Sequence, residues 1–380
     1  MNSVFAKLLY TGRSLNENAF LHIKNSTIAG ISKMAEGRLL GKFDVITPAF
    51  IDPHSHIGIF RAGEPNDQGE SNEKMNAFPV LSDVLDSLQM DDAAFKDAIE
   101  MGVLYSCIVP GSGNILSGRS AVIRHWAAHS TGALLSRAGI KAALGYNPMS
   151  TKDWKGERPT TRMGAMCLLR GQLDEARQKI KALQRVKGKK KEEIIFSATQ
   201  MLFRDILEGR ETLRIHVHKI DDIAAMLRLV DEFKLKVTVE HAMDVHGPDI
   251  FGELKKAGIP VIYGPVDGFA SKVELRNKNW KNIRHLLDSG VQYGLMTDHP
   301  VTPVRNLLIQ TRWFIRAGLS KQQAVELISR KNAEILGVDR MLGTLQKGRW
   351  ASFVCWNGDP FDLTRYPVAV FAEGSLVYPV

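Results

Sequence analysis

The sequence predicts an α/β protein: a (β/α)8 TIM barrel over residues 49–342, with a small composite β-sandwich built from residues 1–48 and 343–380. Three observations support this fold class. Strand-like and helical runs alternate along the middle of the chain, as in parallel α/β architectures. The length of that region suits an eightfold barrel, for which ~250 residues are usual. Both ends carry short strand patterns, and neither end has enough strands for a stable sheet of its own.

The strand patterns follow one another in a regular order. At the N-terminal end they cover residues 5–10, 19–24 and 27–31, separated by Gly, Asn and Ser turns. The barrel is expected to start with the apolar stretch 46–57. Its later strands are expected at residues 103–109, 140–145, 213–216, 235–240, 260–263 and 291–296, with helices such as 220–233 and 322–336 between them. This makes seven barrel strands, so one is missing from the pattern or degenerate. Strand patterns return at residues 351–356 and 369–378.

A doubly wound parallel sheet is the alternative architecture. Such a sheet favours a glycine-rich phosphate-binding turn after its first strand. This chain has Asp52-Pro-His-Ser-His56 at that place, so the barrel is the preferred prediction.

Composition places the chain among ordinary globular proteins. It has 380 residues, 44% of them hydrophobic and 24% charged. No apolar run approaches the ~20 residues of a membrane span, and the first residues do not resemble a signal peptide. Three distant cysteines, Cys107, Cys167 and Cys355, argue against a disulfide framework. We therefore expect a cytoplasmic protein without a membrane partner, and a homo-oligomer is possible.

The formal charge of +9 has one conspicuous source, a lysine run at residues 187–191. No aromatic residues interleave these lysines, so a solvated loop is a better interpretation than a nucleic-acid site. The positive balance favours a small-molecule substrate that is anionic.

Histidines gather at the ends of the predicted strands. His54 and His56 are two residues apart, so on a strand they point to one face, and two such imidazoles are a good start for a transition-metal site. Further polar residues follow other predicted strands, where the chemistry of a (β/α)8 barrel lies: His216, His218, His241, Asp298 and His299.

The residues around the first histidines resemble a known family signature. Pro48-Ala-Phe-Ile-Asp-Pro-His-Ser-His56 is similar to the signature of the amidohydrolase superfamily, with Ala49 where Gly is usual. Residues 110–123, a glycine-rich loop, and residues 158–164 and 264–267 resemble the imidazolonepropionase-like branch. The resemblance implies a domain built from both termini, with residues 343–356 re-entering it. It also implies a metal-dependent amidohydrolase.

The chemistry of such a site assigns roles to these residues. A divalent metal held by three histidines lowers the pKa of bound water to about 7, and a carboxylate beside it can move the proton. The resemblance implies Asp298 as this general base. The predicted metal ligands are His54, His56, His216 and Asp298, around a single divalent ion for which Zn is preferred and Fe, Mn or Ni are alternatives. Whether His216 or His218 is the ligand stays open, although the family pattern favours the first.

The predicted reaction is attack of metal-bound hydroxide on a C–N bond of an amide, cyclic amide or imidazolone-like substrate. The resemblance implies that His241 either binds a second metal or polarises the scissile carbonyl. Substrate contacts are expected from His218, Lys219, Tyr146, Arg119, Arg162 and His299. Arginines among them suit a substrate carboxylate. Two alternatives remain: a deaminase acting on a ring C=N carbon, and a metal-binding pseudoenzyme or scaffold.

The prediction of one ion rather than a bridged pair rests on three residues. Two cations ~3.5–4 Å apart need a bridging anion, and Tyr146 stands where relatives often carry Glu. Lys141 lies five residues upstream with the opposite side-chain parity, so we expect it to point away from the site. Glu240 precedes His241 and is also expected to point away.

Overall fold

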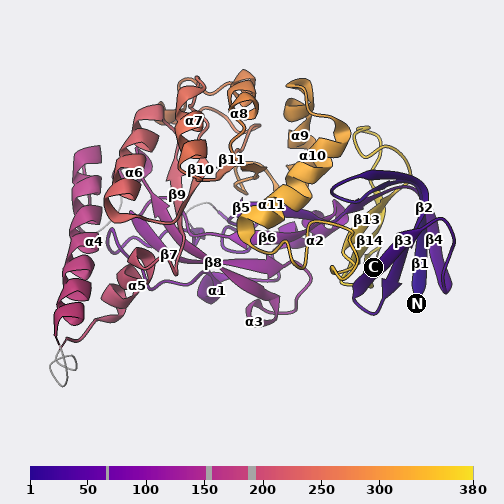
Figure 1. Ribbon diagram of the computed structural model, residues 1–380, viewed down its shortest axis with the longest axis horizontal. Coiled ribbons are helices and arrows are strands. Elements are labelled where there is room, and N and C mark those ends of the chain that lie inside the picture. Colours follow the sequence, from indigo (N-terminus) through magenta and orange to yellow (C-terminus); the bar gives the residue numbers. More distant parts are fainter. Residues whose placement is uncertain (66–67, 151–155, 187–193, 380) are drawn as a thin grey trace.

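The computed structural model describes residues 1–65, 68–150, 156–186 and 194–379. The lysine run at 187–191 lies outside the described residues. Two sheets organise the molecule: an eight-stranded barrel sheet and, at one end, a seven-stranded sheet made by both termini (Figure 1). The predicted α/β class, with a nearly closed barrel and a second sheet from the termini, is thus confirmed.

The barrel sheet runs in sequence order from its first strand to its last. Its strands are β5 (Phe50–Ser55), β6 (Val103–Ile108), β7 (Leu116–Arg124), β8 (Leu134–Ala143), β9 (Leu213–Val217), β10 (Val237–His241), β11 (Val261–Tyr263) and β12 (Tyr293–Leu295). All neighbours pair in parallel except β7, which is antiparallel to both β6 and β8. Parallel strands place their carboxyl ends on one rim, where polar side chains can meet.

Strand β7 is the strand that the sequence pattern missed. Residues 110–123 were expected to form a glycine-rich loop, but from Leu116 onward they form this antiparallel strand. Gly118 has a φ of 116°, and a Cβ there would collide with the Ser82 carbonyl oxygen. A glycine inside a strand can mark such a close backbone approach rather than a loop.

The barrel closes between β12 and β5 with the help of a side chain. Beyond the end of β12, the Asp298 amide donates to the His54 carbonyl (3.1 Å), and the His56 amide donates to the His299 carbonyl (3.0 Å). Lower down, the buried Asn332 amide donates to the carbonyls of Ile51 (2.7 Å) and Leu295 (2.9 Å). Asn332 therefore replaces part of the missing ladder between the first and last strands.

Helices surround the barrel. They are α1 (Val84–Ser87), α2 (Ala93–Glu100), α3 (Ser130–Ala133), α4 (Arg162–Arg185), α5 (Ala198–Leu207), α6 (Ile220–Phe233), α7 (Asp249–Lys256), α8 (Ile283–Ser289), α9 (Leu307–Arg316), α10 (Lys321–Glu326) and α11 (Asn332–Leu336). In α6 the buried positions Ile223, Met226 and Leu229 recur at helical spacing, so one face packs on the sheet. Within the described part of the chain, none of the helices has the length and apolarity needed to cross a membrane.

The second sheet interleaves the two ends of the chain. Its order is β15 (Ser375–Tyr378), β14 (Pro367–Ala372), β13 (Phe353–Trp356), β4 (Arg38–Pro48), β1 (Asn2–Tyr10), β2 (Leu15–Lys24) and β3 (Thr27–Ser32). Strand β4 pairs in parallel with β1 and antiparallel with β13. The stretch 46–57, expected as one strand, instead changes sheets at Ala49, which separates β4 from β5.

The domain boundaries at residues 48 and 343 remain a prediction that truncation can test. A protein beginning at Phe50 would lose β4, so β13 would lack its neighbour and the apolar core shared by both ends would open. We expect a fall in melting temperature of roughly 10 °C or more, since each kcal/mol lost shifts a large domain by ~2–4 °C. Differential scanning calorimetry of the purified protein measures it. An unchanged melting temperature would mean that the ends are independent appendages.

Candidate metal centre

His54 and His56 leave the end of β5 and converge on one carboxylate. Their Nε2 atoms lie 3.4 and 3.3 Å from Oδ1 of Asp298. Their other ring nitrogens are occupied, because His54 Nδ1 donates to Glu240 Oε2 (2.6 Å) and His56 Nδ1 donates to the Val109 carbonyl (2.7 Å). Such outer hydrogen bonds fix the tautomer and aim the free nitrogen of a metal-binding histidine.

Asp298 follows β12 in a left-handed backbone conformation, with φ 52°. Burial alone would raise the pKa of its carboxyl group, but His241, His54 and His56 hold that pKa well below its usual range. Its side chain is 14% exposed. Asp298 is therefore a carboxylate at neutral pH, placed between the histidines and the solvent.

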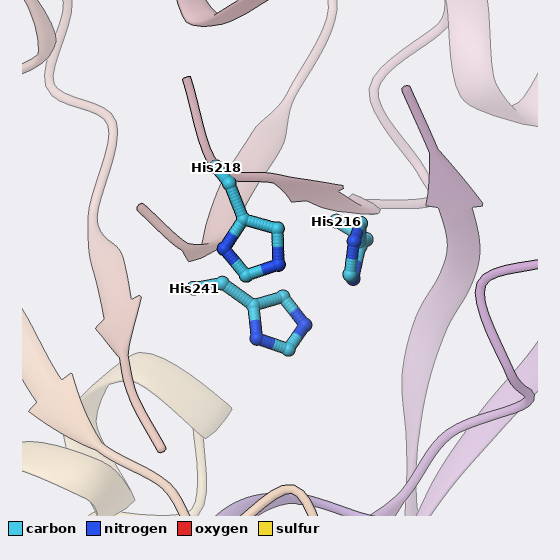
Figure 2. A group of neighbouring side chains, drawn as sticks. All are labelled: His216, His218 and His241. Atoms are coloured by element: carbon cyan, nitrogen blue, oxygen red, sulfur yellow. The ribbon is translucent and has the colours of Figure 1, made fainter. Parts of the chain in front are cut away.

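A second group of histidines comes from β9 and β10. One ring nitrogen from each of His216, His218 and His241 lies within 4.8 Å of the others, and the three rings face a common space (Figure 2). His54, His241 and Asp298 form another such group, so His241 belongs to both. His241 donates through Nδ1 to the Gly264 carbonyl (3.0 Å), while its buried Nε2 has no hydrogen-bond partner among the described residues.

The donor chemistry fits a divalent cation. Burial lowers the pKa of His56 below its ordinary value and lowers that of His218 to about 4, although Glu274 opposes the shift at His218. Burial first, and then neighbouring histidines, hold the pKa of His216 and His241 well below the usual range. These imidazoles are neutral at pH 7, which is the form that binds metal. The orphaned, buried Nε2 of His241 is the kind of atom that a cation would satisfy.

The expectation that Lys141 points away from the site is wrong. Lys141 is fully buried, and its Nζ lies 3.2 Å from His54 Nε2. It pairs on β8 with Arg214 of β9, whose side chain also enters the barrel. The parity argument failed because β8 ends at Ala143 and Gly145 turns the chain with φ 81° before Tyr146. Burial lowers the pKa of Lys141 to about 8, against the opposing effects of Glu240 and Asp298.

The expectation for Glu240 is also wrong. Glu240 is fully buried, and besides the bond from His54 it accepts one from Thr238 Oγ1 (2.7 Å) and pairs with Arg214 (3.2 Å). Burial alone would raise the pKa of Glu240, but Arg214 and the His54 bond outweigh it and lower that pKa to about 2. The alternation of side-chain direction along β10 ends at His241, which has a φ of 81°. The side chains of Glu240 and His241 therefore both reach the centre. Glu240 orients the His54 ring by accepting the hydrogen bond from its Nδ1.

Glu274 contacts the histidines although no sequence motif marks it as a site residue. It lies in the short 3-10 turn Val273–Leu275 after β11, and it is fully buried. Its Oε2 accepts from the Tyr146 amide (3.0 Å), and its Oε1 lies 3.5 Å from His216 Nε2 and 3.8 Å from His218 Nε2. Asn147 also reaches His216, with Nδ2 3.1 Å from Nε2.

Three predicted substrate contacts lie elsewhere. Arg119 on β7 pairs with Ile140 of β8, and Ile140 pairs with Leu213, the first residue of β9. Arg119 therefore lies at the end of the barrel opposite to the histidines. Arg162 forms a two-pronged ion pair with Asp222 (2.7 and 3.2 Å). The structure does not bring either arginine, or the Tyr146 ring, into the cavity described below.

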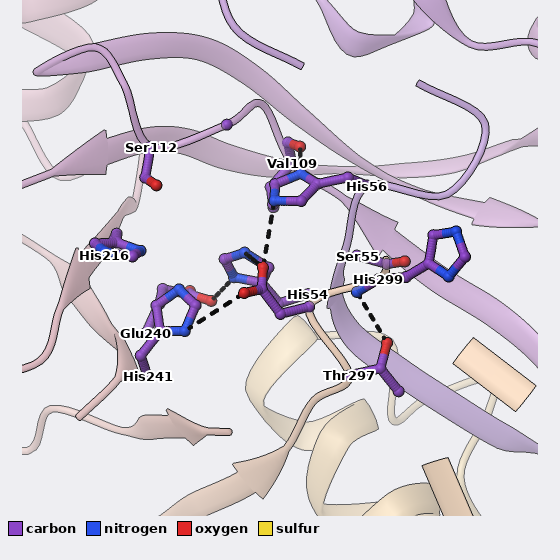
Figure 3. Close-up of polar contacts among 12 residues, drawn as sticks. His54, Ser55, His56, Val109, Ser112, His216, Glu240, His241, Thr297 and His299 are labelled. Atoms are coloured by element: carbon purple, nitrogen blue, oxygen red, sulfur yellow. Dashed lines mark hydrogen bonds and ion pairs between the residues drawn. The ribbon is translucent and has the colours of Figure 1, made fainter. Parts of the chain in front are cut away.

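Lys219 and His299 border the site without joining its donors. Lys219 Nζ lies 3.9 Å from Asp244 Oδ2. His299 accepts from the Val304 amide (3.3 Å), and its ring lies on the far side of the β5 end from His216 and His241 (Figure 3). The reason is that His299 follows Asp298, so the two side chains diverge.

A small cavity of about 60 Å³ opens onto the donors. His218, His241 and Asp298 line it together with Lys272 and Lys278. Its apolar lining comes from Met243, Pro265, Phe269, Leu275 and Val301. A separate cavity of about 700 Å³ lies between α4 and α6, and none of these donors lines it.

Comparison with known proteins identifies relatives along the whole chain. A model of the amidohydrolase family matches residues 156–377, more than half of the chain. Amidohydrolase tasK of Hapsidospora irregularis is 25% identical over 363 residues, 90% of this chain and 36% of tasK, so the chain spans about a third of that relative.

Solved structures agree with these sequence relatives. An amidohydrolase from Thermotoga maritima MSB8 superposes with a TM-score of 0.92 at 26% identity over 100% of both chains. The A. niger ochratoxinase superposes with a TM-score of 0.60 at 14% identity over 99% of this chain and 95% of its own, a likeness of fold.

Proposed function

Because the chain belongs to the amidohydrolase family, we propose that it is a metal-dependent hydrolase that cleaves a C–N bond in a small-molecule amide, cyclic amide or imidazolone-like substrate. The observation that carries the proposal is the convergence of two donor groups on His241, with Asp298 in one of them. The imidazolonepropionase-like branch stays a prediction.

The proposed cation ligands are His54, His56 and Asp298 on one side and His216, His218 and His241 on the other. Histidine with carboxylate suits Zn, and Fe, Mn or Ni can take the same donors. A bound divalent ion supplies a Lewis acid and brings the pKa of water close to neutrality. The chain supplies the orientation: Glu240, Val109 and Gly264 hold the Nδ1 atoms, so Nε2 faces the centre.

The placement of Lys141 changes our proposal for the number of ions. The single-ion prediction assumed that no anion could bridge a pair. If the neutral Lys141 amine added to CO2 and released a proton, the resulting carbamate would be such an anion. The Lys141 nitrogen is fully buried and lies 3.2 Å from His54 Nε2. We therefore propose two cation positions in place of one.

Asp298 is proposed as the proton carrier. Its carboxylate is ionised and lies within 3.4 Å of the Nε2 atoms of His54 and His56, so it can take a proton from water and deliver it to the leaving nitrogen. His241 either holds a cation through Nε2 or polarises the substrate carbonyl.

Metal analysis with a turnover screen tests this function. We expect bound divalent metal in the purified protein and release of ammonia or amine from at least one cyclic ureide, imidazolone or N-acyl amino acid. Metal removal should abolish turnover and re-addition should restore it. A protein that binds no divalent metal after reconstitution would refute the proposal, and an intact ring beside released ammonia would identify a deaminase instead.

A further inference from the structure

We propose that Lys272 and Lys278, at the mouth of the cavity above His218, His241 and Asp298, recognise a carboxylate of the substrate. The inference rests on the proposed hydrolase function and names its substrate class: amides, such as N-acyl amino acids, that carry a carboxylate beside the scissile bond. Both lysines line the cavity that reaches the metal-donor groups.

The segment that carries these lysines is anchored at two points between them. Glu274 is fully buried and accepts from the Tyr146 amide (3.0 Å). Asn277 donates to Asp244 through its backbone amide (2.5 Å) and its side chain (3.2 Å). Glu274 and Asn277 each lie within two residues of a lysine. Their hydrogen bonds therefore hold the backbone that carries both ammonium groups. A fixed backbone lowers the entropy lost on ligand binding.

Among the residues that the structure describes, neither lysine has an anionic contact partner. No described residue is within hydrogen-bond or ion-pair distance of the Lys272 ammonium group, and Lys278 donates only to the neutral Gly268 carbonyl. Burial lowers the pKa of Lys278 to about 8, with Asp267 and Asp298 opposing. A carboxylate would give both cations a charge-assisted partner.

The rest of the lining suits the remainder of such a substrate. Apolar surface from Met243, Leu275 and Val301 surrounds the lysines. An anionic group at the lysines and an amide at the donors suit these polar groups and apolar walls, and with a volume of about 60 Å³ the cavity encloses only part of such a ligand. The arginines expected for this task, Arg119 and Arg162, are not in the cavity lining.

A pair of hydroxamate probes tests the inference without a known substrate. Succinomonohydroxamic acid and butyrohydroxamic acid share a metal-binding head and chain length, and only the first ends in a carboxylate. Isothermal titration of the metal-loaded full chain should show about tenfold or tighter binding of the carboxylated probe. Lys272→Met and Lys278→Met should each reduce this preference to about threefold or less, whereas Lys278→Arg should retain most of it. Lys281→Met is the matched control, because Lys281 is exposed nearby and outside the cavity lining.

The outcomes separate the two proposals. Equal affinity of the wild-type protein for both probes, or an unchanged preference in both methionine variants, overturns the carboxylate inference and leaves the hydrolase proposal intact. Failure of the loaded protein to bind either probe also overturns it. A wild-type protein that takes up no metal refutes the hydrolase function, and the inference falls with it. Metal content and melting temperature of every variant exclude misfolding as the cause.

Discussion

Replacing Asp298 with Asn should leave a folded, metal-containing protein whose turnover is at least ~100-fold lower, the scale of lost acid–base catalysis. Asn has the shape of Asp but cannot take a proton. The carboxylate is ionised, lies 3.3–3.4 Å from two imidazole nitrogens and is 14% exposed, whereas Glu240 and Glu274, the other acids that contact these histidines, are fully buried.

Steady-state kinetics on a verified substrate and elemental analysis measure the two effects separately. Asp288→Asn, a change to an exposed carboxylate on α8, is the matched control and should keep full activity. Full activity of Asp298→Asn would show that Asp298 is not the base, and loss of metal would show that it is mainly a ligand.

Replacing Lys141 should have the second large effect, on metal content. Lys141→Met should lose about one of two metal equivalents and at least ~100-fold of turnover, because the proposed bridge disappears from the buried centre. Lys141→Arg should fail equally, since a guanidinium keeps the charge but cannot be carboxylated. Short carboxylic acids should partly restore Lys141→Ala, since they can occupy the space of the missing carboxylate.

The same variants distinguish the alternative role of Lys141 as a simple cation. In that case Lys141→Arg would retain metal and activity, and wild-type protein would bind one equivalent of metal. A metal content near one equivalent per wild-type chain, unchanged by added bicarbonate, would support the single-ion prediction over the proposed pair.

The strand-end rule predicted that histidines and one aspartate from separate strands would lie together, and the structure brings these side chains together. His54, His56, His216, His241 and Asp298 lie in or just after the carboxyl-terminal part of a buried strand, and the fold brings the ends of these parallel strands to one rim. That part of the site follows from local pattern and topology alone.

The errors arose where local rules were extended past their range. Alternation predicts side-chain direction only inside a strand, so it failed for Lys141 when counted across the turn at Gly145. Arg119 was assigned to a rim loop because β7 was not recognised. Since β7 is antiparallel to β8, the chain runs away from the rim along it and places Arg119 at the opposite end of the barrel. Glu274 was missed because packing of the segment after β11, and no local motif, brings it to the histidines.

The pairing of β4 with β13 also affects how the protein is made. These strands meet at Pro48 and Phe353, and a ribosome adding roughly 5–20 residues per second needs roughly 15–60 s to synthesise the chain between them. Through that interval one edge of β4 has no partner, and an open edge can pair with other chains. The moment of greatest sensitivity to aggregation is therefore synthesis, and the sensitive surface is an edge that the finished protein covers with its own last strands.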